Sequence, residues 1–172
     1  MQTEAVLQKL LKSYQRYYDV REDGVEPPFV AEADFSLQSE QFFIVKTAKL
    51  SESDSKEFVY FAVPDRLSAE TLAQLDRLAW ERGLAKIKPH SSHKNSDVHL
   101  IILTQHIDDD AAKLIKKTHH YKSYKMTING WSHYKLIAAD LSTGEIVCNR
   151  QGSSLKKHLG NIINSFSEGE NK

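Results

Sequence analysis

The sequence predicts an α+β protein in which helices cover a mixed β-sheet. Apolar residues recur at helical spacing in four segments, and alternating or continuous apolar runs between these segments are typical of strands. In chain order the segments read αβββα-β-αβββα, which favours a sheet packed against helices. A length of 172 residues suits one domain, which we expect over residues 1–164, followed by a polar, disordered tail over residues 165–172.

The first third of the chain predicts one helix and three strands. Thr3–Tyr18 is amphipathic, with apolar residues three and four positions apart. The polar stretch Asp19–Pro28 follows, and the two prolines that close it cannot continue a helix. We expect strands over Phe29–Leu37, Phe42–Leu50 and Glu57–Val63.

The middle of the chain predicts two helices around a buried strand. Ser68 is a suitable cap for a helix that runs to about Gly83. The polar loop Lys86–Asp97 leads into Val98–Thr104, whose apolar run suits a central strand buried on both faces. A helix over Asp108–Thr118 begins with acidic residues and ends with basic ones, as the helix dipole favours.

The C-terminal third predicts a hairpin, a strand and a helix. Asn129-Gly130 lies between two alternating runs, a pattern typical of a two-residue type I′ turn. A strand over Glu145–Asn149 and a helix capped by Ser153 follow. The turn predicts four cross-strand pairs: Ile128 with Trp131, Met126 with His133, Tyr124 with Lys135, and Lys122 with Ile137.

Composition excludes several classes of protein. The chain is 40% hydrophobic and 27% charged, and it has neither an apolar run of about 18 residues nor a signal-peptide core, so we expect no membrane association. The single cysteine, Cys148, excludes an internal disulfide and agrees with a cytoplasmic protein. Lys113–Lys125 interleaves basic residues with two tyrosines, but a formal net charge of zero makes nucleic acid a less favoured partner.

The two halves of the chain differ in charge. Residues 1–80 contain 9 basic and 14 acidic residues, whereas residues 81–172 contain 14 basic and 9 acidic ones. Helix-end chemistry explains this difference best, because folding intermixes the halves, and head-to-tail self-association is the alternative. Independently of this difference, the absence of a catalytic motif leads us to expect an unknown protein partner or self-association.

Seven of the eight histidines lie between His90 and His133. A helix end explains His119 and His120, and the predicted hairpin face explains His133. His90 and His93 have no such structural reason. Two imidazoles three positions apart can share one divalent metal ion, although a stable site needs three or four ligands. The pair is a candidate metal site, and a solvated loop is the alternative; no other cofactor is expected.

The first half of the chain, read as αβββαβ, resembles the core of the restriction-endonuclease-like nucleases. In that family an acidic residue on the second strand and an acid-x-Lys motif on the third bind the catalytic metal. The third predicted strand lacks acid-x-Lys, while Glu32 and Asp34 lie on the first strand and Lys46 on the second. The resemblance implies a metal-dependent nuclease, or a degenerate relative, with Glu32, Asp34 and Lys46 as its site residues.

The whole chain also resembles an uncharacterised family of small bacterial proteins, mainly clostridial. The resemblance is carried by Lys88-Pro89-His90-x-x-His93, by Gly130-Trp131, and by Gly144-Glu145-Ile146-Val147-x-Asn149-x-x-Gly152. It implies no activity.

No catalytic motif is assembled in the sequence. Glycine-rich phosphate loops, nucleophile elbows and His-Glu-x-x-His are all absent. The favoured hypothesis is a non-enzymatic cytoplasmic binding or protein-interaction module. A metal-dependent nuclease and a metal-binding protein that uses the His90/His93 loop are the alternatives.

Overall fold

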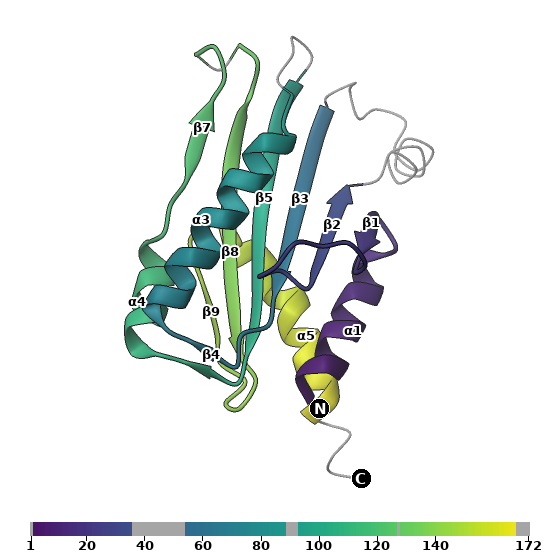
Figure 1. The fold of residues 1–172 in the computed structure, drawn as a ribbon, viewed down its shortest axis with the longest axis vertical. Coiled ribbons are helices and arrows are strands. Elements are labelled where there is room, and N and C mark those ends of the chain that lie inside the picture. The colour runs from purple at the N-terminus through teal and green to yellow at the C-terminus, as the bar shows by residue number, and fades with distance from the viewer. Residues whose placement is uncertain (1, 36–53, 89–92, 127, 168–172) are drawn as a thin grey trace.

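A computed structural model shows a mixed β-sheet between two layers of helices (Figure 1). It describes residues 2–35, 54–88, 93–126 and 128–167. The helices are α1 (Gln2–Tyr14), α3 (Ala69–Lys86), α4 (Asp109–Lys117), α5 (Lys156–Ser167) and the short 3-10 helix η1 (Gln151–Leu155). The strands are β1 (Tyr18–Arg21), β2 (Ala31–Phe35), β3 (Asp54–Ala62), β4 (Arg66–Leu67), β5 (His93–Thr104), β6 (His106–Ile107), β7 (Tyr121–Ser123), β8 (Trp131–Asp140) and β9 (Ile146–Cys148).

The large sheet combines a parallel centre with antiparallel edges. Its strands lie in the order β1-β2-β3-β5-β8-β7, and β9 also pairs with β8. β3, β5 and β8 are parallel, and the other pairings in this sheet are antiparallel. α3 and α4 provide the crossovers that parallel neighbours need. The predicted α+β class with a mixed sheet is confirmed.

The central strand β5 is buried on both faces, as its apolar run predicted. Val98, Leu100 and Ile102 belong to the core under α3 and α4. Ile101 and Leu103 point to the opposite face and belong to the core under α1 and α5. Within the described ranges, no helix combines the length and the apolar character needed to cross a membrane.

The N-terminal strands differ from the prediction. The first helix was expected to reach Tyr18, but α1 ends at Tyr14 and Tyr18 begins β1. β1 lies at the start of the predicted polar loop because its backbone pairs with β2 and Arg21 makes ion pairs with two β2 carboxylates. Such long-range pairing overrides local propensity. The strand predicted over Phe42–Leu50 lies outside the described residues.

The predicted register of the β7–β8 hairpin is wrong. Tyr121 pairs with His133 and Ser123 with Trp131, so the connection between β7 and β8 is longer than the predicted two-residue turn. The two-residue turn would have placed Lys122 opposite Ile137, but β9 occupies that edge of β8 and Ile137 pairs there with Cys148. Competition between two partner strands for one edge therefore decides the register.

α3 begins as predicted and ends later than expected. The Ser68 hydroxyl oxygen accepts a hydrogen bond from the backbone N–H of Thr71 at 3.1 Å, as a helix cap does. Gly83 lies inside the helix and allows it to approach β5 closely, because a Cβ at this position would lie 2.5 Å from Val98 Cγ2. Close packing, rather than helix termination, explains this glycine.

The C-terminal helical segment begins as η1 rather than at a serine cap. Ser153, the predicted cap, lies within η1 and donates its hydroxyl to the Arg150 carbonyl oxygen at 2.8 Å. α5 continues through Ser167, so residues 165–167 of the expected tail are helical. As predicted, its apolar side chains are buried against the sheet: Leu159, Ile162 and Ile163.

Asn149 joins β8, α4 and η1 through its side chain. Its Oδ1 accepts the N–H groups of Leu136 at 3.0 Å and Gly152 at 2.7 Å. Its Nδ2 donates to the carbonyl oxygens of Tyr134 at 3.0 Å and Thr118 at 3.2 Å. All the hydrogen-bonding capacity of this buried amide is used, as burial of a polar group requires. This network explains the Asn149-x-x-Gly152 spacing.

We expect Gly152→Ala to lower the free energy of unfolding by about 1–3 kcal/mol, because the added Cβ would clash with the Leu136 carbonyl oxygen. Gly160→Ala is the matched control. Its Cβ would lie 3.6 Å from Ile146 Cδ1, an ordinary contact inside α5, so it should raise the free energy by about 0.5–1 kcal/mol. Urea denaturation measures both changes, and equal stability of the two variants would contradict this role of Gly152.

Candidate metal centre

A row of polar side chains crosses the sheet near the amino ends of the parallel strands. Glu57 of β3 is in register with Asp97 of β5, and Asp97 is in register with His133 of β8. His133 in turn pairs with Tyr121 of β7, and the two rings lie 5.3 Å apart. Side chains alternate along a strand, so His99 shares the face of Asp97, the face that carries α1 and α5.

Lys135 and Tyr18 hold the two carboxylates of this row. Lys135 Nζ lies 2.8 Å from Asp97 Oδ2 and 4.0 Å from Glu57 Oε1. The Tyr18 hydroxyl donates a hydrogen bond to Glu57 Oε2. Burial, then the charge of Glu57, raises the pKa of Tyr18 above its ordinary value of 10.0, so the phenol remains a donor. Two acids thus share one base, which leaves a local charge of −1.

His99 is buried beside these carboxylates without a hydrogen bond. Its side chain is 1% exposed, and neither ring nitrogen has a partner among the described residues. Burial, reinforced by the positive charge of Lys135, lowers the pKa of His99 to about 3. The imidazole is therefore neutral near pH 7 and has a free lone pair. Asp97 Oδ1 is likewise buried and unpartnered within the described chain.

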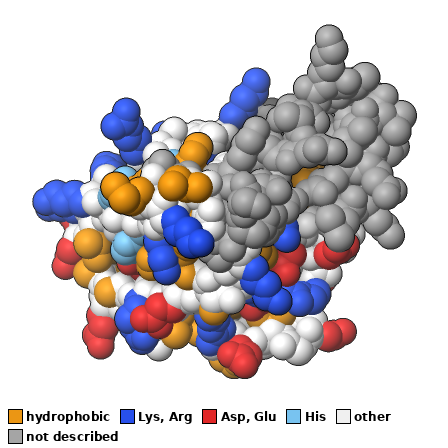
Figure 2. Space-filling model, turned by 90° about the horizontal axis from the view of Figure 1, so that it is seen from above, with side chains coloured by type: hydrophobic (Ala, Val, Ile, Leu, Met, Phe, Trp, Pro, Cys, Tyr) orange, Lys and Arg blue, Asp and Glu red, His pale blue; other side chains and the backbone are white. Residues whose placement is uncertain are grey.

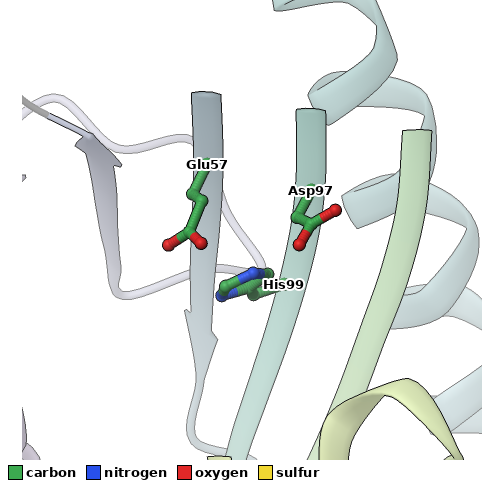
Figure 3. A group of neighbouring side chains, drawn as sticks. All are labelled: Glu57, Asp97 and His99. Atoms are coloured by element: carbon green, nitrogen blue, oxygen red, sulfur yellow. The ribbon is translucent and has the colours of Figure 1, made fainter. Parts of the chain in front are cut away.

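Glu57, Asp97 and His99 form a ligand set for a divalent cation. One ligand atom from each residue can be chosen so that all three lie within 4.8 Å of one another. The imidazole lies below and between the two carboxylate groups (Figure 3). Ligands in a tetrahedral zinc site are about 3.4 Å apart, so modest side-chain rotation would close the set around an ion. Two carboxylates and one imidazole suit zinc or manganese better than magnesium.

Near the carboxyl ends of the parallel strands, the carboxylates of Asp140 and Asp108 accept hydrogen bonds from donors of the chain itself. Burial alone would raise the pKa of Asp140, but the Ser142 hydroxyl and three backbone N–H groups donate to this carboxylate and lower its pKa from 3.8. Asp108 accepts from Arg66 at 2.7 Å, and His106 lies 3.4 Å away. Ligands often bind open α/β sheets at this end. Here both carboxylates are already hydrogen-bonded to groups of the chain itself. The candidate site therefore lies at the amino ends of the strands.

Glu32 and Asp34, predicted as nuclease site residues, lie together on β2 and face α3. Lys86 of α3 binds Glu32 Oε2 at 2.9 Å and Asp34 Oδ1 at 3.1 Å. Arg21 binds the other oxygen of Asp34 at 3.2 Å and Glu32 Oε2 at 3.0 Å. Two acids are thus balanced by two bases. Lys46, the third predicted residue, lies outside the described residues.

The clustered histidines separate in the structure. His90 lies outside the described residues, and His93 begins β5 with its backbone paired to β3, its side chain not being described. His120, expected at a helix end, stacks on Trp80 at 5.3 Å. The candidate pair His90 and His93 stays a prediction, while His99, to which the sequence assigned no role, joins the ligand set.

The sequence contains part of the signal for this set. Asp97-Val98-His99 has the two-residue spacing that places two side chains on one face of a strand. Asp97 was expected at the end of the polar loop and His99 in the strand that follows, so the two were not predicted to share one face of a strand. Glu57 joins them only because β3 is parallel to β5 in one particular register, which no local pattern indicates.

Comparison with known proteins gives one match. Residues 2–161 match the model of a family described as a domain of unknown function (DUF8052). No curated protein matches the chain, and no solved structure matches it.

We expect His99→Leu to raise the free energy of unfolding in the presence of a chelator by about 1 kcal/mol, because leucine removes two buried ring nitrogens that lack partners. His120→Leu is the control. It removes a ring that lies 2.9 Å from the Asp76 carboxylate, so it should lower the free energy by about 1–2 kcal/mol. Urea denaturation near pH 7 distinguishes the two, and a destabilised His99→Leu variant would show that His99 is structural.

Proposed function

The chain belongs to the family of the domain of unknown function DUF8052, and we propose that it binds a divalent metal ion through Glu57, Asp97 and His99. The observation that carries this proposal is the buried His99 imidazole, which is neutral, has no partner among the described residues and lies beside two carboxylates. A free lone pair next to two anionic oxygens is costly in a folded protein unless a ligand uses it.

Charge also favours a cation at this position. Glu57 and Asp97 together contribute two negative charges, and Lys135 compensates one of them. The ion pair uses Asp97 Oδ2 and leaves Oδ1 free, so a metal ion can be bound while Lys135 stays in place. Lys135 would then fix the orientation of the Asp97 carboxylate, as outer hydrogen bonds do for metal ligands.

The mixed ligand set favours a transition metal. Imidazole nitrogen suits zinc and carboxylate oxygen suits manganese, whereas magnesium and calcium prefer sites built from oxygen alone. We therefore propose zinc or manganese as the ion. A site with three protein ligands leaves a further position for water or for a bound anion.

Calorimetric titration with Zn²⁺ and with Mn²⁺ tests this function. We expect wild-type protein to bind at least one of them with micromolar or tighter affinity, and Asp97→Asn and His99→Gln to weaken binding by about 100-fold or more. The exposed His119 supplies a matched control, and His119→Gln should bind as wild type does.

The same titration separates this site from the His90/His93 loop. If His90→Ala/His93→Ala abolishes binding while Asp97→Asn retains it, the ion belongs to the loop and this proposal is wrong. Absence of binding to wild type at micromolar concentrations would exclude both sites.

A metal-dependent nuclease is the second candidate function. The sequence suggested it from the order αβββαβ. Among the described residues, α1, β1, β2, β3, α3 and β5 occur in that order when the short β4 is set aside, although β1 was not among the predicted strands and the predicted strand Phe42–Leu50 lies outside the described residues. A lysine beside two carboxylates adds support, since its ammonium group can bind a phosphate oxygen. A bound ion would supply Lewis acidity, while the acids would position it.

Incubation with supercoiled and single-stranded DNA in Mg²⁺ or Mn²⁺ tests the nuclease. We expect cleavage by wild type and a loss of about 100-fold or more for Glu57→Gln and Lys135→Met. Cleavage that persists in these variants but disappears in Glu32→Gln would show that the nuclease site lies on β2 and not at Glu57 and Lys135. If metal-loaded wild-type protein cleaves neither substrate, the nuclease is excluded and only the metal-binding function remains.

A further inference from the structure

The loop between β7 and β8 presents two aliphatic side chains to solvent. Met126 is 89% exposed and Ile128 is 76% exposed, the highest values among the large hydrophobic residues of the described chain. We call these two residues the hairpin tip. Large apolar side chains exposed this fully at the end of a hairpin are typical of a contact surface.

The backbone of the loop is fixed by its own hydrogen bonds. Ile128 N–H donates to the Lys125 carbonyl oxygen at 3.1 Å, and Asn129 N–H donates to that of Tyr124 at 3.1 Å. Lys125 and Met126 both adopt left-handed backbone conformations, with φ of 45° and 52°, which residues other than glycine rarely adopt. The loop thus presents its apolar side chains in a preformed arrangement, which reduces the entropy lost when a partner binds.

The stretch of sequence that contains the hairpin tip is basic. Residues 111–139 contain six lysines and no acidic residue. Lys135 points into the candidate metal centre, and α4, which carries three of the other lysines, lies at the opposite end of β7 from the hairpin tip (Figure 1). Lys122 on β7 and Lys125 in the loop are exposed beside the tip. Seen from above, hydrophobic side chains at this end of the molecule lie among lysine and arginine side chains (Figure 2).

We propose that the hairpin tip inserts into the surface of an anionic lipid bilayer, with Lys122 and Lys125 beside the headgroups. Methionine and isoleucine offer the flexible hydrocarbon that transfers favourably into the acyl region. Lysines next to them are attracted to the negative surface potential of anionic lipids. Binding of this kind needs no membrane-spanning helix, so it departs from the expectation of no membrane association, which rested on the lack of a long apolar run and of a signal-peptide core.

Two other partners fit this surface less well. Nucleic acid is bound through aromatic stacking, but the Tyr121 ring already packs on His133 and Lys122 lies over the Tyr124 ring at 5.5 Å. A second copy placed symmetrically on the tip would bring lysines against lysines, a like-charge contact that disfavours a dimer. An anionic bilayer satisfies both the apolar tip and the basic surroundings.

Co-sedimentation with lipid vesicles tests the proposal. Wild-type protein should bind vesicles that contain about 30% phosphatidylglycerol, should not bind pure phosphatidylcholine, and should be released as ionic strength rises from about 0.1 M to about 1 M. Met126→Ser/Ile128→Ser and Lys122→Glu/Lys125→Glu should each reduce partitioning by about tenfold or more.

Matched controls lie on other surfaces of the molecule. Val30 is also an exposed hydrophobic residue, and Lys12 is an exposed lysine of α1, so Val30→Ser and Lys12→Glu should partition as wild type does. Circular dichroism and the melting temperature confirm that the tip variants remain folded, as expected for exposed positions.

Three results would overturn the proposal. The first is absence of binding to anionic vesicles at low ionic strength, and the second is equal binding by the tip variants and wild type. The third is evidence for a different partner in the absence of vesicle binding. If the tip substitutions weaken binding to short single-stranded or duplex DNA, the surface binds nucleic acid. If they dissociate a dimer in sedimentation experiments, the surface binds a second copy of the chain.

Discussion

The register of β5 between its two parallel neighbours is the constraint on which the candidate site depends. The apolar residues of β5 alternate between two helix-covered cores, so a slip of one residue would exchange the side chains of the two faces. The same register places Asp97 beside Glu57 and His99 beside Lys135. The hydrophobic core thus positions polar residues that it does not contain, because β3, β5 and β8 extend beyond α1 and α5 (Figure 1).

The two ends of the parallel strands use polar groups in opposite ways. At the carboxyl ends, the Asp140 carboxylate accepts hydrogen bonds from neighbouring backbone and hydroxyl groups, which stabilises the turns there. At the amino ends, His99 and one oxygen of Asp97 have no such partners within the described chain. Proteins commonly retain such costly arrangements where a ligand is bound, at the expense of stability elsewhere. This contrast separates the amino ends of the parallel strands from their carboxyl ends.

Short sequence patterns correctly predicted the features that depend only on neighbouring residues. The Ser68 cap, the acidic start and basic end of α4, and the doubly buried β5 follow from short patterns, and each is confirmed. Features that depend on distant partners were missed. β1 forms because β2 lies beside it, and the β7–β8 register changes because β9 competes for the same edge. The ligand set belongs to this second class, since its carboxylates come from strands whose adjacency only the topology reveals.

The crossover connection through α3 has a consequence for how the protein reaches its native state. Glu57 and His99 are brought together by a parallel pairing that closes a long loop of chain, with the whole of α3 between them. Contacts of such high sequence separation are slow to form, because the chain entropy of loop closure is lost before any contact compensates it. The β1–β2 and β7–β8 pairings join segments that are close in sequence and can form earlier. A nascent chain therefore has no assembled ligand set until β5 docks between its neighbours, so ion capture would report completed folding rather than initiate it.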